Sequence, residues 1–268
     1  MKKYILLVLI MIIVASLVLT GCNETAGGDK SWDNVKAKGV FVMGLDDSFP
    51  PMGFKDDKGE VVGFDVDAAR EVCKRLGVEL KLQSIEWTAK NQELDTGNID
   101  CIWNGFSISE ERKEQVLFTE PYMNNRMVLV VNTSSNLTKL ADFEGKKVGL
   151  QAGSSAADAL NASADFKAKL GGVVEFDENL MALMDLEKGG IDAVLMDEVV
   201  AIYNIMTGNK DMLVIDDALS SEEYGVGFRK ADKELMKKVE DTLKEMAADG
   251  TLAQIANKWF EKDITTIK

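Results

Sequence analysis

One segment of the chain places together the groups that could bind a carboxylate. Ser107 follows Gly105, and Arg112 lies about one helical turn further on. Free backbone N–H groups after a strand, a hydroxyl and a guanidinium fork make a donor set that suits a carboxylate. The alternative is that Ser109 only caps a helix and that Arg112 lies on its surface. The residues alone leave both interpretations open.

A second segment could bind the other side of the same anion. The run Gln151-Ala-Gly153-Ser154-Ser155 follows a predicted strand and is typical of a glycine turn that starts a helix, whose N–H groups, including that of Ser155, face outward. Asp197 ends another predicted strand, where apolar neighbours would desolvate it. Because an unpaired buried carboxylate is costly, Asp197 needs a cation, either an internal Lys or Arg or the ammonium group of a ligand.

Two aromatic residues could form the walls of a side-chain pocket. Asp46 and Phe49 come after the first predicted strand, and Trp87 comes after the predicted strand that ends at residue 85. Aromatic rings on such loops can enclose a ligand side chain and contact a cation. The alternative is that Phe49 and Trp87 only cap the hydrophobic core.

Composition excludes several classes of function. The 268 residues are 46% hydrophobic, enough for a sizeable core, and their net charge of −14 offers no basic stripe to a nucleic acid. The chain has no histidine, which excludes zinc enzymes with the usual ligand sets and Ser-His or Cys-His hydrolases. Its three cysteines form no CxxC motif. We therefore expect no metal, no cofactor and no catalytic residue.

The N-terminus is typical of an exported protein. Lys2 and Lys3 precede an uncharged run that ends at Thr20, and Leu19-Thr20-Gly21-Cys22 resembles the bacterial lipobox, in which the cysteine is lipidated. The alternative is a plain transmembrane anchor with an incidental cysteine. We expect a lipoprotein signal peptide over 1–21, a flexible tether over 22–31 and a folded part that begins near Trp32.

The remaining sequence alternates strand-like and helical runs, which is the order of an α/β fold. Strands are predicted at 40–45, 79–85, 99–103, 128–131, 147–150, 173–176, 191–196, 213–215 and 224–228. Helices are predicted at 65–76, 91–96, 232–248 and 251–260. In the first helix we expect Asp65 as the N-cap and Gly77 just past the end.

Residues 94–102 and 186–194 are similar in sequence: in each stretch a predicted helix ends at a glycine and a predicted strand follows directly. Either such joints look alike in any α/β protein, or the chain has two similar lobes that each offer groups at the carboxyl ends of their strands, where ligands bind in open α/β sheets.

Several motifs, taken together, resemble the polar amino-acid-binding lipoproteins and periplasmic proteins that feed ABC importers. The resemblance runs from Val40 to about Phe260, and its markers are Phe49-Pro-Pro-Met-Gly-Phe54, Val62-Gly-Phe-Asp-Val-Asp67, Gly97-Asn-Ile-Asp100, Ser107-Ile-Ser-Glu-Glu-Arg-Lys113 and Phe118-Thr-Glu-Pro-Tyr122. It implies a type II two-lobe clamp with a hinge of two strands. Lobe 1 would be 32–128 plus 222–268, and lobe 2 would be 129–221.

The resemblance also implies roles by position. Arg112 would pair with the α-carboxylate of an amino acid, helped by Ser107 and the N–H group of Ser155. Asp197 would take the α-ammonium, together with the carbonyl of Gly105 and the hydroxyl of Ser107. The residues expected around the ligand side chain are Asp46, Phe49, Trp87 and Asn104.

Two departures from the family pattern bear on these roles. After Trp87 the chain has Thr-Ala-Lys90-Asn-Gln92 instead of the usual Asp-Gly-hydrophobic segment, so this rim of the site and the specificity are reshaped. Cys73 lies where some members begin a short disulfide, but the usual partner position holds Leu80. A bridge to Cys101 and two buried free thiols both stay open, and the thiols are favoured.

The resulting hypothesis is a monomeric, lipid-anchored extracytoplasmic protein that binds a free amino acid and docks on an ABC permease. A neutral or polar amino acid is expected, with cystine among the candidates, and basic amino acids stay open because Asp46 is near. The alternatives are a prephenate-type dehydratase on the same fold and a surface adhesin or sensor module.

Overall fold

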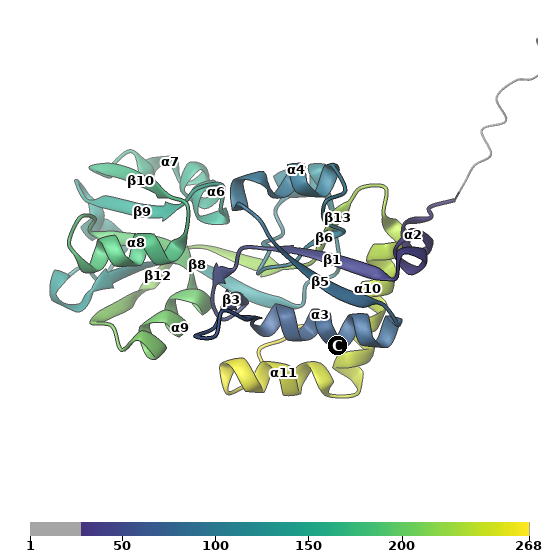
Figure 1. The fold of residues 1–268 in the computed structure, drawn as a ribbon. Coiled ribbons are helices and arrows are strands. Elements are labelled where there is room, and N and C mark those ends of the chain that lie inside the picture. Colours follow the sequence, from purple (N-terminus) through teal and green to yellow (C-terminus); the bar gives the residue numbers. More distant parts are fainter. Residues whose placement is uncertain (1–27, 268) are drawn as a thin grey trace, which may run out of the picture.

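The computed structural model describes residues 28–267, so the predicted signal peptide, the predicted lipidation site Cys22 and most of the predicted tether lie outside the described residues. Two five-stranded sheets form two lobes (Figure 1). The first sheet has the strand order β5-β1-β6-β13-β7, with bounds Glu79–Ser84, Val40–Leu45, Cys101–Ile102, Gly227–Arg229 and Val116–Phe118. The second has the order β10-β9-β11-β8-β12, with bounds Gly172–Phe176, Lys147–Gln151, Ala193–Asp197, Met123–Asn132 and Met212–Tyr224. The α/β clamp predicted from the sequence is confirmed.

Helices surround each sheet. Those of the first lobe are α2 (Ser31–Lys38), α3 (Phe64–Leu76), α4 (Lys90–Asp95), α5 (Glu110–Gln115), α10 (Lys233–Ala248) and α11 (Thr251–Phe260). Those of the second are α6 (Ser155–Ala162), α7 (Ala164–Lys167), α8 (Asn179–Glu187) and α9 (Glu198–Gly208). The 3-10 turns are η1 (Trp87–Ala89), η2 (Thr133–Ser135) and η3 (Leu140–Phe143). None of the helices within residues 28–267 has the length and apolar character needed to span a membrane.

Strands β8 and β12 are the longest elements of the second sheet and run antiparallel beside each other. β8 follows β7 of the first sheet along the chain, and β12 is followed by β13, so the chain passes between the sheets at both places. The lobe boundaries given above stay a prediction.

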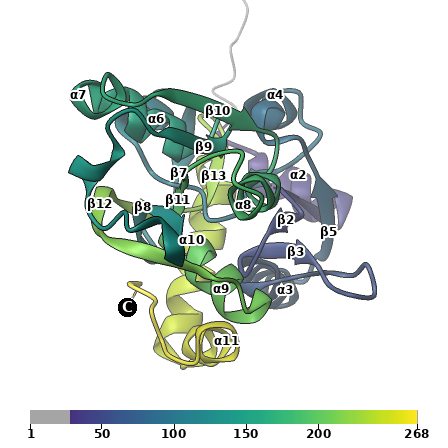
Figure 2. The same ribbon diagram turned by 90° about the vertical axis from the view of Figure 1, so that its left-hand side faces the viewer.

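The two lobes also touch away from these strands. A small sheet of β2 (Ser48–Phe49), β3 (Gly53–Lys55) and β4 (Val61–Val62) belongs to the first lobe and lies beside α8 and α9 of the second (Figure 2). The ring of Phe54 on β3 is 5.8 Å from that of Tyr203 on α9 and 5.8 Å from that of Trp259 on α11, measured between centroids. The structure is therefore that of the clamp with its lobes together.

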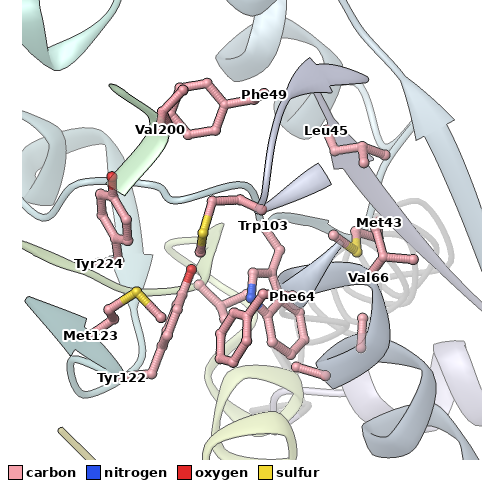
Figure 3. Close-up of a cluster of buried hydrophobic side chains, with 14 of the residues drawn as sticks. Met43, Leu45, Phe49, Phe64, Val66, Trp103, Tyr122, Met123, Val200 and Tyr224 are labelled. Atoms are coloured by element: carbon pink, nitrogen blue, oxygen red, sulfur yellow. The ribbon is translucent and has the colours of Figure 1, made fainter. Parts of the chain in front are cut away.

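A layer of buried aromatic side chains packs together in the core of the first lobe. Phe64 and Tyr122 stack with centroids 6.1 Å apart, and Trp103 and Tyr224 pack against Tyr122 (Figure 3). Burying such rings is the main favourable contribution to folding, at about 2–3 kcal/mol for each large side chain. The layer continues to Val200 on α9, so the core extends under both lobes.

The predicted N-cap of α3 is wrong. The helix begins at Phe64 with Gly63 at the N-cap, and a Cβ on Gly63 would lie 2.2 Å from the carbonyl oxygen of Met52, so only glycine fits there. Asp65 instead points inward and accepts a hydrogen bond from the backbone N of Gly105 at 2.7 Å. The predicted glycine end at Gly77 is confirmed by its left-handed conformation.

Four predicted strands need correction. The predicted strands 213–215 and 224–228 are parts of β12 and β13, since β12 runs to Tyr224 without a break in the strand. The predicted strand 99–103 shortens to β6, and 191–196 shifts to β11. Helices α2, α7 and α9 were not predicted.

Cys73 and Cys101 are buried free thiols, as favoured from the sequence. Burial raises the pKa of Cys73 to about 12, so the thiolate needed for disulfide chemistry is scarce at neutral pH.

Candidate functional site

The predicted site residues meet at one cavity between the lobes, which all of them except Ser107 line. Most follow the carboxyl end of a strand, as expected for a ligand site in open α/β sheets. The first lobe contributes Asp46, Phe49, Trp87, Asn104, Gly105 and Arg112. The second contributes Gln151, Ser154, Ser155 and Asp197.

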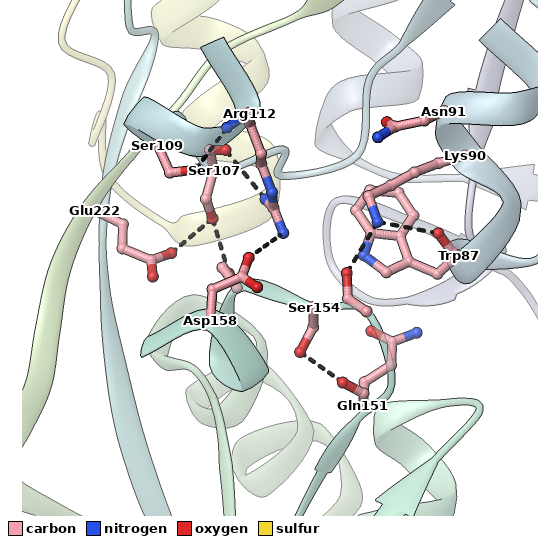
Figure 4. A network of polar contacts seen from close by, with 12 residues as sticks. Trp87, Lys90, Asn91, Ser107, Ser109, Arg112, Gln151, Ser154, Asp158 and Glu222 are labelled. Atoms are coloured by element: carbon pink, nitrogen blue, oxygen red, sulfur yellow. Dashed lines mark hydrogen bonds and ion pairs between the residues drawn. The ribbon is translucent and has the colours of Figure 1, made fainter. Parts of the chain in front are cut away.

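Arg112 is positioned by a helix cap and by burial. Ser109 does cap α5, because its Oγ accepts from the backbone N of Arg112 at 3.2 Å, but the arginine is only 8% exposed and does not lie on the surface. Its Nη1 donates to the carbonyl of Ser107 at 3.1 Å, and its Nη2 pairs with Asp158 on α6 at 3.2 Å (Figure 4). The guanidinium lies 4.9 Å from the ring centroid of Phe106. Through Nη2, the guanidinium of Arg112 therefore contacts the second lobe directly.

Ser107 links the two lobes. Its Oγ donates to Oε2 of Glu222 on β12 at 2.6 Å and lies 3.0 Å from the Oγ of Ser155 (Figure 4). Ser155 is the first residue of α6, where unpaired backbone N–H groups and the helix dipole favour an anion. A carboxylate next to Arg112 would therefore also face the start of α6.

Asp197 is a buried carboxylate without a cation. It is 4% exposed, and its Oδ1 accepts from Asn125 Nδ2 at 2.7 Å and from the hydroxyl of Tyr224 at 2.6 Å. Within residues 28–267 no lysine or arginine nitrogen lies within 4.0 Å of it, and its Oδ2 accepts no hydrogen bond. Burial and, secondly, repulsion by Glu222 raise the pKa of Asp197 to about 7. Of the two cations considered from the sequence, an internal one is absent from this part of the chain.

Asp46 lies at the other end of the cavity. Its Oδ1 accepts from the backbone N and the hydroxyl of Ser48 at 2.8 and 2.6 Å, and its Oδ2 accepts from Gln151 Nε2 at 2.8 Å. Phe49 and Trp87 are buried and line the same cavity. Both also belong to hydrophobic clusters, so each ring is part of the cavity wall and part of the hydrophobic core.

Two groups from the loop after β6 complete the cavity. Asn104 accepts from the backbone N of Asp46 at 3.1 Å through Oδ1, while its buried Nδ2 has no partner within residues 28–267. Gly105 has φ +55°, and a Cβ there would lie 3.0 Å from a ring carbon of Phe49. The asparagine thus has a donor to offer, and the glycine leaves room for the rings of Phe49 and Tyr224.

Sequence reasoning did not select Gln151 and Ser154 as site residues. Gln151 is the last residue of β9, as Asp197 is of β11, and its side chain bridges Asp46 and, through its oxygen, Asn179. The strand-end rule that singled out Asp197 would have found Gln151 as well. The Oγ of Ser154 donates to the carbonyl of Gln151 at 2.7 Å and so shapes the turn before α6.

An acidic rim adjoins the cavity. Besides Asp46 and Trp87, this rim contains Lys55 and the carboxylates of Asp47, Glu86, Glu93, Asp177 and Glu178. Burial and then repulsion by Asp46 and Asp47 raise the pKa of Glu178. Added negative charge is therefore unfavourable at this end of the site.

Comparison with known proteins gives a consistent picture. Residues 41–262 match the family of bacterial extracellular solute-binding proteins, family 3. The chain is 33% identical over 259 residues to the L-cystine-binding protein TcyJ of Escherichia coli strain K12, covering 96% of both chains. It is 28% identical to the L-cystine-binding protein TcyA of Bacillus subtilis strain 168, covering 99% of this chain and 100% of that protein.

Solved structures are similar over nearly the whole described chain. An ABC uptake transporter substrate-binding protein from Streptococcus pneumoniae with bound histidine has a TM-score of 0.87 at 36% identity, covering 90% of this chain and 100% of that one. The ancestral amino-acid-binding protein AncCDT-1, a precursor of cyclohexadienyl dehydratase, has a TM-score of 0.79 at 30% identity, covering 86% and 99%.

Proposed function

The chain belongs to the bacterial extracellular solute-binding proteins, family 3, and from this premise we propose that it captures one free L-amino acid between its lobes and delivers it to an ABC permease. We further propose that it works outside the cytoplasm as a monomer held to the membrane by a lipid on Cys22.

The observation that carries the proposal is the placement of two opposite charges in one cavity. Arg112 comes from the first lobe and the unpaired carboxylate of Asp197 from the second, and both line the same space. A zwitterion supplies the cation that Asp197 lacks and a second carboxylate for Arg112, which already pairs with Asp158. A ligand without an ammonium group would leave the carboxylate of Asp197 buried and unpaired.

The α-carboxylate is assigned to Arg112, to Ser107 and to the N–H group of Ser155 at the start of α6. The α-ammonium is assigned to Oδ2 of Asp197, with the Gly105 carbonyl and the Ser107 hydroxyl as further acceptors. The assignments are supported by the place of Arg112, Gly105, Ser155 and Asp197 in the lining of the cavity and by the contact of Ser107 with Ser155. For Asp197 they are also supported by the two hydrogen bonds that engage Oδ1 and leave Oδ2 to a ligand.

The ligand side chain would lie between Phe49 and Trp87, facing Asp46, Asn104 and Gln151. This polar end suits a neutral or polar amino acid, L-cystine included, and the acidic rim disfavours aspartate and glutamate. Basic amino acids remain among the candidates because Asp46 is a carboxylate. The names of the relatives, which include cystine-binding, arginine-binding and glutamine-binding proteins, support a panel of this kind.

Closure is proposed to follow from the ligand itself. Since the ligand contacts groups of both lobes only when they are together, its binding energy shifts the population toward the closed form. Small backbone changes in β8 and β12, near residues 130 and 223, would swing the lobe 129–221 against the rest of the chain.

A dehydratase is the second candidate function, because AncCDT-1 is described as the precursor of such an enzyme. Every carboxylate in the cavity already has a role in zwitterion or side-chain binding, so the binding function is the better supported. Incubation with prephenate and detection of product would establish dehydratase activity.

A surface adhesin or sensor is a further alternative. If the protein has that role, deletion of its gene should leave amino-acid uptake unchanged.

A thermal-shift screen over the twenty amino acids and L-cystine tests the proposal. A compound that binds only the folded state raises the melting temperature, by an amount set by its concentration relative to Kd. We expect a subset of the panel to shift the protein and Arg112→Ala to abolish every shift. Unchanged shifts in Arg112→Ala would contradict the site assignment.

A further inference from the structure

We propose that Lys90 is a latch that holds the two lobes together over the bound amino acid and slows its release; the proposal rests on the function proposed above. Lys90 is the first residue of α4, and its side chain lies next to that of Trp87 (Figure 4).

Lys90 connects the lobes through its ammonium group. Its Nζ donates to the carbonyl of Gly153, in the turn between β9 and α6, at 2.9 Å. It also donates to the carbonyl of Trp87 in its own lobe at 3.2 Å and lies 5.1 Å from the centroid of the Trp87 ring. One cation thus joins the aromatic wall of the site to the turn that leads into the anion-binding start of α6.

Within its own lobe the charge of Lys90 contacts only the carbonyl and the ring of Trp87, and no carboxylate balances it. The side chain is 8% exposed, and within residues 28–267 no carboxylate oxygen lies within 4.0 Å of its Nζ. Burial, and then repulsion by Arg112, lower the pKa of Lys90 to about 8. By contrast, Lys258 pairs with Asp67 at 2.6 Å on the surface, where both charges remain partly hydrated. Burying an ammonium without a carboxylate is costly, so the position calls for a compensating role.

The contact with Gly153 can exist only while the lobes are together. Gly153 has φ +66°, and a Cβ on it would lie 3.4 Å from Thr88 and 3.7 Å from the Nζ of Lys90, so the turn passes very close to the first lobe. When the lobes separate, Nζ exchanges this carbonyl for water. A bound α-carboxylate at Arg112 would add negative charge beside the ammonium and favour the latched form further.

The expected effect is therefore on release. An amino acid that enters the open form meets the site before the latch forms, so the association rate should not depend on Lys90. A hydrogen bond from a charged donor that must break before release should slow dissociation by about tenfold. Most affinity differences between related complexes do arise in the dissociation rate.

The test compares Lys90→Met with Lys81→Met, which changes an exposed lysine on β5. Stopped-flow tryptophan fluorescence, to which Trp87 in the site contributes together with Trp32, Trp103 and Trp259, would follow binding of L-cystine, L-histidine, L-arginine and L-glutamine. The first to be measured is the one that raises the wild-type melting temperature most. We expect Lys90→Met to dissociate about tenfold faster with an association rate within twofold of wild type, and Lys81→Met to match wild type in both.

Two further measurements separate a latch from a residue needed for folding. The ligand-free melting temperature of Lys90→Met should equal or exceed that of wild type, because a buried unpaired charge is removed. From Lys90→Gln, which keeps a neutral donor, the ligand should dissociate at a rate between those of wild type and Lys90→Met.

The latch is refuted if the ligand dissociates from Lys90→Met at the wild-type rate. It is also refuted if Lys90→Met instead lowers the ligand-free stability and the association rate. If wild type binds none of the four amino acids, the proposed function fails first and the latch with it; if wild type binds and only the dissociation result fails, the latch alone is wrong.

Discussion

Replacing Asp197 with asparagine should change ligand binding and ligand-free stability in opposite directions. The carboxylate is buried, receives two hydrogen bonds on Oδ1 and has no cation within 4.0 Å among residues 28–267. If its partner is the ammonium of the ligand, Asp197→Asn breaks a buried ion pair, which costs about 3–5 kcal/mol. Kd should rise by a factor of a few hundred to a few thousand.

The same substitution should stabilise the ligand-free protein at pH 7.5. Folding raises the pKa of Asp197 from 3.8 to about 7, so at pH 7.5 the ionised carboxylate lowers the free energy of unfolding by up to about 4 kcal/mol. Between pH 4 and 7 the folded chain binds the extra proton and the unfolded chain does not, so this destabilisation grows as the pH rises and is absent below pH 4. Allowing for a weaker hydrogen-bond acceptor in the amide, we expect a gain of about 1–2 kcal/mol, or several degrees in melting temperature.

Calorimetric titration and thermal unfolding of Asp197→Asn would measure both effects, with Asp216→Asn, at an exposed position of β12, as the control. A Kd within threefold of wild type would show that the carboxylate does not hold the ligand. A ligand-free melting temperature of Asp197→Asn below that of wild type at pH 7.5 would contradict the claim that the charge of Asp197 has no stabilising partner among residues 28–267.

Two other predictions follow from the same site. The affinity for an amino acid should fall about tenfold per pH unit below pH 7, because the ammonium requires Asp197 to lose its proton, and this slope in a titration series should vanish in Asp197→Asn. Gly105→Ala should weaken binding by more than tenfold and destabilise the fold by about 1 kcal/mol, because the new Cβ would lie 3.0 Å from Phe49 at a residue with φ +55°; binding equal to wild type in a titration would contradict the tight packing around this glycine.

Much of the fold follows from local sequence signals. Helix α10 and helix α11 carry apolar residues at helical spacing, and β1 and β9 are short apolar runs followed by turn residues, so each was predicted close to its observed bounds. Helix α9 was missed because apolar residues run consecutively at its start and give no helical period. Such a segment cannot be distinguished from a buried strand by pattern alone.

Asp65 shows where a local rule gives the wrong assignment. An aspartate before a helical run is a good N-cap by sequence. In the structure the N-cap is Gly63, because the carbonyl of Met52 lies so close that only glycine fits at position 63. Asp65 is then free to fix the backbone of Gly105 from below, a contact between segments far apart in the chain. No spacing in the sequence predicts it.

The site was predictable as far as it consists of strand ends. All nine residues selected from the sequence line the cavity or, for Ser107, contact its lining. The contacts of Arg112 with Asp158, Ser107 with Ser155 and Lys90 with Gly153 were not predicted, because they depend on how one lobe lies against the other. That geometry is set by packing across the cleft, which local patterns do not contain.

The most direct measurement of the central claim is a calorimetric comparison of one amino acid that binds, taken from the thermal-shift panel, with its N-acetyl and carboxamide derivatives. If opposite lobes hold the two charged ends, each derivative should bind at least a hundredfold more weakly than the parent. Binding of either derivative within a few fold of the parent would contradict the claim that Arg112 and Asp197 recognise a zwitterion.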